Sequence, residues 1–388
     1  MHFRAGNHHL RRVQSGFRSQ KGQALLVTVL LISAAVGISL FSFIRPRSIE
    51  AQNDARTELA LATARQALIN YASGRAPTNR PGELPCPDRN NDGRDNDGAC
   101  NTTATQIGRL PLATLQIPDL RDGYGERLWY AVSSNFKANT AVSPLNSNTP
   151  GQLTVTGAAA ASNVIAIVFA AGPAIAGQNR SAGNVNNVAH YLEGENANGD
   201  TVFTTATASD TFNDRLLAIT ATSFFPQVEM RVARQLRETL YLHYNAKGYL
   251  PPATAYGSLV SCTPASQGRI PAVPTSCGGG QTAWYSAPQP WFDPLTDAWN
   301  QVLFYAVAPA CTDPTAPNCT GAGGFLTVNG VGGIRAVLIT PGAPYTGQTR
   351  PCASITDCLE APNSTSFPVF THNTGSTSAN DLVIIVSP

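Results

Sequence analysis

Charged side chains are scarce in this sequence, and lysine is almost absent. Asp, Glu, Lys and Arg make up only 13% of the 388 residues, and the three lysines are Lys21, Lys137 and Lys247. So low a charge fraction argues against a disordered acidic or basic chain and against the ion-pair-rich surface of a hyperthermophilic protein. The formal net charge of +2 does not indicate a nucleic-acid-binding protein.

Histidine is also rare, which removes the usual signals of catalysis. Three of the six histidines fall within residues 1–9, and the others are His190, His243 and His372. None is spaced like the zinc-binding pair of a metalloprotease helix, and no phosphate-binding or nucleophile motif follows an apolar run. The sequence therefore points to no catalytic residue, and we expect a protein without enzymatic activity.

Glycine and proline, by contrast, are plentiful, with 33 and 28 residues. They show no collagen-like period, so they indicate many turns between short strands. A chain of this length is expected to form two or three domains.

The N-terminal segment changes abruptly from basic to apolar. Residues 1–21 carry five Arg or Lys and no acid, and residues 24–44 contain no charged side chain. A helix of that length spans roughly 30 Å, about the thickness of the hydrocarbon core of a bilayer. The basic flank would stay in the cytoplasm, so the sequence predicts a transmembrane helix over residues 23–45. An ordinary secretory signal peptide and a plain single-pass anchor are the alternatives.

The junction between these two parts resembles a prepilin leader. Gly22 stands between Lys21 and Gln23, directly before the apolar run, as the cleavage-site glycine does in type IV pilins and type II secretion pseudopilins. The resemblance implies that a prepilin peptidase cuts between Gly22 and Gln23 and leaves the apolar helix on the mature chain. Counted from Gln23, the fifth residue is Val27, where most of that family has Glu. In the family this Glu neutralises the terminal amine of a neighbouring subunit, and a subunit at the fibre tip has no such neighbour above it.

Two helices are expected beyond the apolar run. Residues 48–73 are rich in Ala and free of Gly and Pro, with Leu61, Ala64 and Leu68 on one face, which predicts an amphipathic helix. A second helix is expected from Pro226, with that proline in the first turn. Its apolar face would be formed by Val228, Val232, Leu236 and Leu240.

An internal repeat follows each helix, with the same short blocks in the same order. The matched blocks are IGRLP and QGRIP, DGYGERLWYAV and DAWNQVLFYAV, GQNR and GQTR, YLEGEN and CLEAPN, and NDRLLAIT and NDLVIIVS. From Tyr191 to Thr220 the second copy follows the first at a constant offset of 167 residues. The DGYGERLWY block resembles the turn before the first strand of major pseudopilin heads, and Leu128, Tyr130 and Val132 should alternate on one face of that strand.

These features predict an α+β fold. We expect a long N-terminal membrane-spanning helix followed by two repeated pilin-like heads, each a helix packed on an antiparallel β-sheet. The expected domains are a leader (1–22), a transmembrane helix (23–45), a helix extension with the first head (46–222) and a second head (223–388).

The eight cysteines fall into four neighbouring pairs. In an extracytoplasmic chain this spacing suggests four local disulfides, because a zinc site would need CxxC knuckles and His partners that are absent. The expected pairs are Cys86–Cys100, Cys262–Cys277, Cys311–Cys319 and Cys352–Cys358.

Residues 87–99 resemble the start of an EF-hand-type calcium loop. Acidic or amide side chains stand at positions 1, 3 and 5 of the pattern and Gly93 stands at position 6. The closing Glu at position 12 is missing, so a later Asp would have to replace it. The candidate ligands are Asp88, Asn90, Asp92, Asp95 and Asp97. A solvated turn is the alternative, and Ca²⁺ is the only cofactor that the sequence suggests.

The sequence and its resemblance thus predict a minor pilin or pseudopilin. It would be a structural or assembly subunit of a type IV pilus or a type II secretion pseudopilus, and the missing Glu favours the fibre tip. The expected partners are other subunits through the N-terminal helix, the inner membrane and prepilin peptidase, without nucleic acid. The expected location is the bacterial inner membrane, crossed once, with the heads in the periplasm or on an extracellular fibre. The alternative is a membrane-anchored extracytoplasmic binding or adhesion protein with two repeated domains.

Overall fold

The computed structural model describes most of the chain after residue 20. The described residues are 21–74, 80–95, 100, 106–137, 145–256, 265–271, 299–372 and 380–387, and most side chains before residue 49 lie outside the description. The chain divides into two compact units within its first helix, between Asp54 and Ala55. We describe each unit by itself.

The first helix, α1, runs from Lys21 to Gly74. The expected transmembrane helix over residues 23–45 is wrong, because no helix in the described part of the chain is both long and apolar enough to cross a membrane. A span needs about 20 consecutive apolar residues, and the described residues of α1 do not supply such a run. The single-pass inner-membrane location, with heads in the periplasm or on an extracellular fibre, is therefore not supported either.

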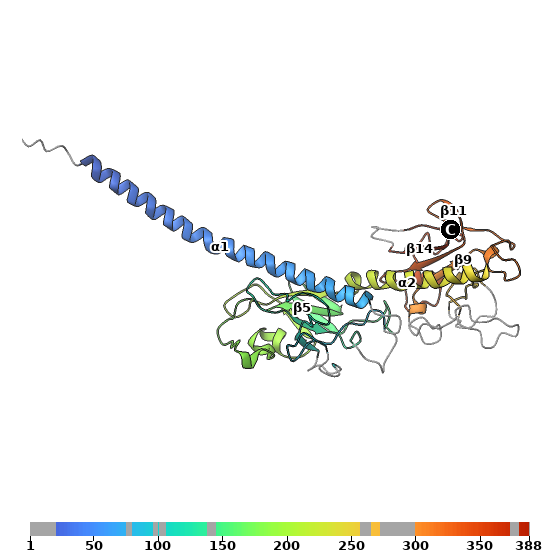
Figure 1. Ribbon diagram of the computed structural model, residues 1–388, viewed down its shortest axis with the longest axis horizontal. Helices are drawn as coiled ribbons and strands as arrows, with labels where there is room; N and C mark the ends of the chain where they lie inside the picture. The colour runs from blue at the N-terminus through green and yellow to red at the C-terminus, as the bar shows by residue number, and fades with distance from the viewer. Residues whose placement is uncertain are drawn as a thin grey trace, which may run out of the picture. The chain divides into compact units, whose positions relative to one another are not determined.

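The α+β character of the fold is confirmed in the second unit. Four strands form an antiparallel sheet in the order β1-β2-β5-β7, and the end of α1 lies over it (Figure 1). The strand bounds are Ile107–Arg109 for β1, Trp129–Val132 for β2, Ala166–Ala170 for β5 and Arg215–Ile219 for β7. The helix packs through Ala60, Leu61, Ala64, Leu68, Ile69 and Ala72, which are buried in one cluster with sheet residues such as Tyr130 and Val168.

A smaller sheet accompanies the first one and differs from the expected purely antiparallel arrangement. It has the order β4-β3-β6, and β3 pairs with β6 in parallel. Its strands are Leu153–Gly157 (β3), Ala161–Val164 (β4) and Val202–Thr205 (β6). Short 3-10 helices lie at Ala182–Asn184, Val188–His190 and Gly194–Ala197.

The expected placement of Leu128, Tyr130 and Val132 on one face of β2 is confirmed, and the smaller sheet covers the other face. All four residues of β2 are buried. Tyr130 and Val132 pack with α1, whereas Trp129 and Ala131 pack in a second cluster with residues of the small sheet such as Phe203. A strand covered on both faces has no solvent-facing positions, so it does not show period-2 polarity.

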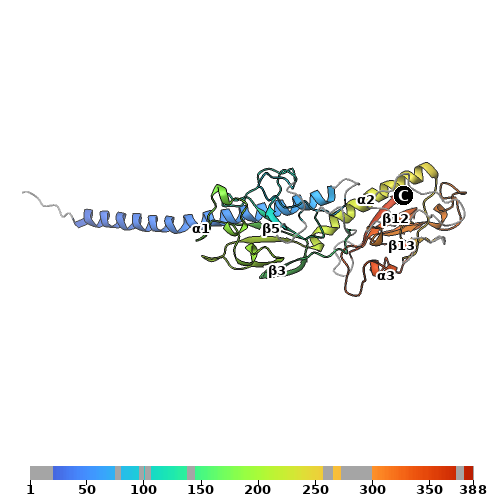
Figure 2. The same ribbon diagram turned by 90° about the horizontal axis from the view of Figure 1, so that it is seen from below.

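The rest of the second unit has the same layout. Helix α2 (Ala221–Lys247) packs on β12 and β14 of a second antiparallel sheet, ordered β14-β12-β9-β8, and Figures 1 and 2 show it running beside these strands. A three-stranded sheet again contains one parallel pair, β10 with β13. The bounds are Gln267–Gly268 (β8), Phe304–Val307 (β9), Leu326–Val328 (β10), Val331–Ile334 (β11), Ala336–Thr340 (β12), Val369–Phe370 (β13) and Leu382–Ser387 (β14), with Ile355–Cys358 as α3 and 3-10 helices at Trp299–Gln301 and Pro309–Cys311.

Helix α2 begins before the expected proline. Thr220 is its N-cap and forms a capping box with Ser223, so Pro226 lies inside the helix rather than in its first turn. Gly248 ends the helix in the left-handed conformation, with φ of 78°. The expected apolar face is confirmed, since Val228, Val232, Leu236 and Leu240 are all buried.

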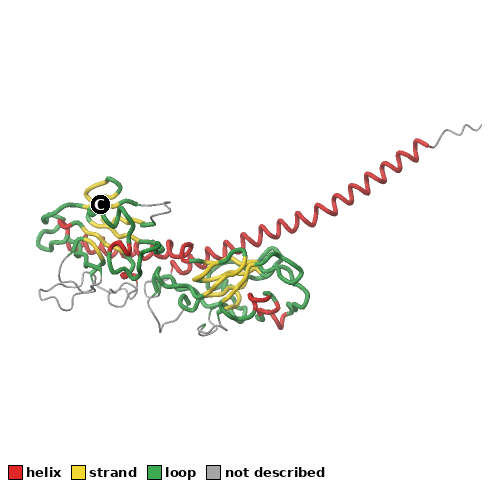
Figure 3. Tube along the Cα trace, turned by 180° about the vertical axis from the view of Figure 1, so that it is seen from behind, coloured by secondary structure: helices red, strands yellow, loops and turns green. Residues whose placement is uncertain are grey.

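The two halves share one hydrophobic cluster. Its residues include Leu68 from α1 and Leu236 from α2. Phe136 contacts the rings of Phe224 and Phe225 at centroid distances of 5.8 and 5.9 Å, and Phe225 in turn meets Trp299 at 6.5 Å. Figure 3 shows that each half nevertheless has its own group of strands.

Candidate functional site

A network of hydrogen bonds between buried carboxyl groups and their neighbours links two segments of the chain at the start of β7. Glu193 Oε1 accepts a hydrogen bond from Gln178 Nε2 at 2.6 Å. Glu193 Oε2 accepts from the backbone N–H groups of Asn213 and Asp214 at 3.0 and 3.1 Å. In return, Asp214 Oδ2 accepts from the backbone N–H of Glu193 at 2.8 Å and from Asn196 Nδ2 at 3.0 Å. The loop that carries Glu193 is thereby fastened to the start of the edge strand.

The second half contains the same network at the positions that the repeat matches. Glu360 accepts from Gln348 Nε2 at 2.6 Å and from the backbone N–H of Asn380 at 3.1 Å. Asp381 Oδ2 accepts from the backbone N–H of Glu360 at 3.3 Å and from Asn363 Nδ2 at 3.0 Å. Four of the five hydrogen bonds of the first network have a counterpart here, and the network fastens a loop to the start of β14.

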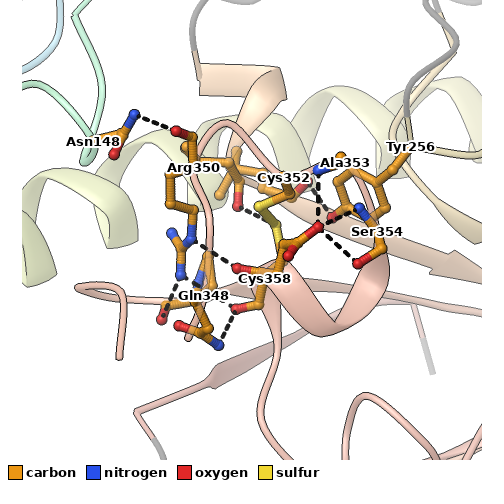
Figure 4. Close-up of a disulfide and its surroundings, with 12 residues drawn as sticks. Asn148, Tyr256, Gln348, Arg350, Cys352, Ala353, Ser354 and Cys358 are labelled. Carbon is orange, nitrogen blue, oxygen red and sulfur yellow. Dashed lines mark hydrogen bonds between the residues drawn. A yellow bond between two sulfur atoms is a disulfide. The ribbon is translucent and has the colours of Figure 1, made fainter. Parts of the chain in front are cut away.

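Beside each network, an arginine donates hydrogen bonds to several backbone carbonyl oxygens. Arg180 donates to the carbonyl oxygens of Gly172 (2.7 Å) and His190 (3.2 Å). Arg350 likewise donates to those of Gly342 (3.2 Å) and Asp357 (3.1 Å). Figure 4 shows Arg350 reaching toward the Cys352–Cys358 loop beside Gln348. A guanidinium suits this role because it offers five donors in a fixed plane.

The electrostatics of the two aspartates are also matched. Burial, with the neighbouring Glu193 carboxylate as the second cause, raises the pKa of Asp214 from 3.8 to about 8. Burial and then Glu360 raise the pKa of Asp381 to about 8 in the same way. The two aspartates therefore share both the direction and the causes of their pKa shifts.

A second arginine of each repeat is also buried. Arg109 lies between the rings of Trp129 and Tyr191, with its Cζ 4.1 and 4.0 Å from their centroids. It donates to the carbonyl oxygens of Val185 and Arg127 at 2.9 and 2.8 Å. Burial lowers its pKa to about 10.

The counterpart of Arg109 is Arg269, which donates to Cys352 O at 2.6 Å. Cys352 follows Val185 by the repeat offset of 167. The two arginines therefore make the same contact in the two halves.

A polar contact joins the halves beside the second network. Asn148 of the first half donates through Nδ2 to Arg350 O at 3.0 Å (Figure 4). Glu229 of α2 is buried and accepts from the backbone N–H of Gly342 at 3.2 Å. Burial raises the pKa of Glu229, and the nearby Ser147 and Arg350 side chains oppose that shift.

Six of the eight cysteines lie in the described residues, and all six are paired. The disulfides are Cys86–Cys100, Cys311–Cys319 and Cys352–Cys358. These are three of the four neighbouring pairs that the sequence suggests. Cys262 and Cys277 lie outside the described residues.

Removing the Cys86–Cys100 disulfide should destabilise the first half. The bond joins residues 14 apart in the chain, and in the chain-entropy model its loss costs about 3 kcal/mol. Urea denaturation of the Cys86→Ser/Cys100→Ser variant measures this. A midpoint equal to that of the parent protein would contradict the expectation.

The expected calcium ligands that the structure describes accept hydrogen bonds from protein groups, mostly from backbone N–H groups of the same loop. The Asp88 carboxylate accepts from the N–H groups of Asn91 at 2.6 Å and Gly93 at 2.7 Å. Asp92 accepts from Arg94 N at 2.8 Å, and Asp95 accepts from the Thr114 hydroxyl at 3.0 Å. Asn90 Oδ1 accepts from the Asp92 N–H at 2.9 Å.

No three His, Cys, Asp or Glu side chains lie together as metal ligands in the described part of the chain. Asp97 lies outside the described residues. Calcium binding by this loop therefore stays a prediction.

The remaining expected residues have no assigned chemistry in the structure. Gly22 and Gln23 lie in α1, and the Gln23 side chain is outside the description. The Nδ1 atoms of His190 and His372 accept from the N–H groups of Asn179 and Val383, both at 3.2 Å. These contacts are structural.

An open groove of about 680 Å³ lies beside α1. Its lining residues carry no acid, base or cysteine: Thr63, Gln66, Ala67, Asn70, Tyr71, Gly74, Thr114, Leu115, Gln116 and Ile117. Such a lining can make neutral hydrogen bonds and one aromatic contact, and Tyr71 is the one titratable side chain among these lining residues.

The carboxyl network was not expected from the sequence. Its residues stand in the repeated blocks GQNR, YLEGEN and NDRLLAIT, so the repeat was the signal that could have found it.

None of the known protein families, curated proteins or solved structures with which the chain was compared matches this chain.

Proposed function

We propose that this chain is a non-enzymatic structural subunit of a pilin-like fibre, as a minor pilin or pseudopilin. The observation that carries the proposal is the organisation of the helix α1. Its last turns pack on a four-stranded antiparallel sheet, while residues 21–54 belong to a separate compact unit that is helix alone in the described chain. A fibre subunit needs both parts, a head and a helix free to pack with other subunits.

The exposed side chains of the helix unit support this use. Val29, Ile32 and Ile49 are 56%, 58% and 56% exposed. An isolated helix is marginally stable in water and gains most of its stability from packing. We therefore assign the partners of this unit to other fibre subunits, which would cover such residues by helix–helix packing.

The processing step follows from the leader resemblance. Cleavage between Gly22 and Gln23 by a prepilin peptidase would release residues 1–22 and leave the rest of α1 on the subunit. Val27 at the fifth mature position favours a place at the fibre tip, where no subunit above requires the usual Glu.

A glycine substitution in cells that make the fibre tests the proposal. Gly22→Val should block processing and keep the chain out of the sheared fibre fraction. Gly16→Val, in the same leader, should leave both processing and incorporation unchanged. Incorporation of the Gly22→Val chain at the parent level, or absence of the parent chain from the fibre fraction, would contradict it.

The groove beside α1 favours one second candidate, a binding or adhesion protein with two repeated domains. Its neutral amide and hydroxyl lining with Tyr71 could contact an uncharged polar ligand. Under this reading the chain would be absent from the fibre fraction, so the same experiment separates the two functions.

A further inference from the structure

In each of the two carboxyl networks, one carboxyl oxygen accepts no hydrogen bond from the described residues. Both oxygens of Glu193 accept N–H donors, and so do both oxygens of Glu360. In each aspartate, Oδ2 takes two donors. Among the described residues, no donor reaches Oδ1 of Asp214 or Oδ1 of Asp381. The glutamates are therefore bonded as carboxylates, and the aspartates are not.

A buried carboxylate oxygen without a donor is costly, because nothing replaces its lost water. Asp381 is fully buried and Asp214 is 6% exposed. Each stands beside a glutamate whose two oxygens both accept N–H donors. Protonating the aspartate removes the repulsion between the two carboxylates and turns one of its oxygens into a donor, for which the side chain of the neighbouring glutamate is the hydrogen-bond acceptor.

We infer that each half of the protein stores one proton on its buried aspartate, Asp214 or Asp381, and that this proton fastens the Glu193 or Glu360 loop to the edge strand β7 or β14. Both halves then loosen together as the pH rises. The same geometry at two places 167 residues apart argues that the arrangement belongs to the repeated unit.

The charged groups around the first pair do not remove the need for a proton. Arg180 reaches the pair only through Gln178, to whose Oε1 it donates at 2.7 Å, and it is also 3.4 Å from Glu126. Arg215, the next residue along β7, faces Glu58 of α1 at 3.6 Å. His190 presents Nδ1 to a backbone N–H and is not bonded to the carboxyl groups.

The surroundings of the second pair are similar in charge. Arg350 interacts electrostatically with Glu229, Tyr256, Glu360 and Asp381 together, so its single charge is shared. His372 accepts the N–H of Val383 in β14. Asp357 accepts a hydrogen bond from the backbone N–H of Ser354 at 2.8 Å, within the capping box of α3. The second pair therefore shares the charge of Arg350 with Glu229 and Tyr256.

The direction of the pH effect follows from the sign of the shift. A group whose pKa is raised on folding stabilises the folded state fully below its unfolded value, near 4, and loses that contribution as the pH rises through the folded value of about 8. With one proton released per loop opening, the opening equilibrium should grow about tenfold per pH unit between pH 5 and 7 and level off above 8.

Hydrogen exchange measured by mass spectrometry on the full chain tests the inference. After correction for intrinsic exchange, peptides with Glu193, Asp214, Glu360 and Asp381 should open about tenfold more per pH unit between pH 5 and 7. Asp214→Asn places an amide where the proton would be, so its first-half peptides should become insensitive to pH while the second half keeps the slope. Asp381→Asn should do the converse, and exposed Asp210→Asn should behave like the parent.

Two results would overturn the inference. One is a parent protein whose loop peptides show no pH slope, or Asn variants that keep it. The other is a slope that calcium or a chelator abolishes, which would assign a cation to the pair. Infrared spectroscopy of the parent protein guards against a variant that fails to fold: a protonated-carboxyl band should disappear between pH 7 and 9, and its persistence or prior absence would also reject the stored proton.

Discussion

Replacing Arg109 by Ala should lower the free energy of unfolding by about 3 kcal/mol. The guanidinium lies between two aromatic rings, and each cation–π contact of a buried arginine stabilises by about 1–2 kcal/mol. It also satisfies the carbonyl oxygens of Val185 and Arg127, and orphaned buried acceptors cost about 1–3 kcal/mol each. Relief of the burial of its charge offsets part of this loss. Urea denaturation monitored by tryptophan fluorescence measures the difference.

A matched arginine on the surface provides the control. Arg121 pairs with Asp119 at 2.7 Å, and its side chain is 46% exposed. Exposed ion pairs contribute about 0–1 kcal/mol, so Arg121→Ala should change the midpoint little. Arg109→Lys should recover only part of the loss, since Lys keeps the charge but not the plane that stacks on the rings. Equal effects of Arg109→Ala and Arg121→Ala would contradict the account of this contact.

Replacing Leu240 by Ala should destabilise the protein by about 2–5 kcal/mol. Leu240 is fully buried on the face of α2 that packs on the sheet of the second half. The cost combines the lost transfer energy of the side chain with the cavity that it leaves. Because the two halves share a hydrophobic cluster, the thermal transition should remain a single one at a lower temperature.

The matched control is two residues along the same helix. Leu242 is 58% exposed, so Leu242→Ala keeps helix propensity similar and removes little packing. We expect a change within about 0.5 kcal/mol. A Leu242→Ala variant as unstable as Leu240→Ala would show that the outer face of α2 is covered in solution.

The helices were the part of the fold that sequence could predict best. The buried face of α2 follows from Val228 to Leu240 at helical spacing, because one apolar stripe decides which side packs. The sequence places the start of α2 too late, because Pro226 is an acceptable first-turn residue, whereas the helix begins at the capping box of Thr220 and Ser223.

The sequence located the strands but did not show what covers each face of them. The sequence placed Leu128, Tyr130 and Val132 on one face of β2, as the structure does, but gave no partner for the opposite face. The small sheet buries Trp129 on the other side as well, and its pairing depends on segments such as β6 that are far along the chain. The transmembrane reading relied on composition before residue 45, and the described helices do not support it.

The candidate site lay beyond sequence reasoning for the same reason. Glu193 and Asp214 are 21 residues apart, and nothing local indicates that their carboxyl groups meet. These residues occur in both copies of the repeat, but the repeat does not indicate what they do. The expected calcium residues show the reverse case, in which a local pattern was visible but its oxygens bond their own loop.

The start of the native chain tests the proposed function most directly. Mass spectrometry of the protein purified from cells that make the fibre should show Gln23 as the first residue. That result would follow from leader removal after Gly22. A native chain that retains residues 1–22 in the assembled fraction would contradict the account of this protein as a processed fibre subunit.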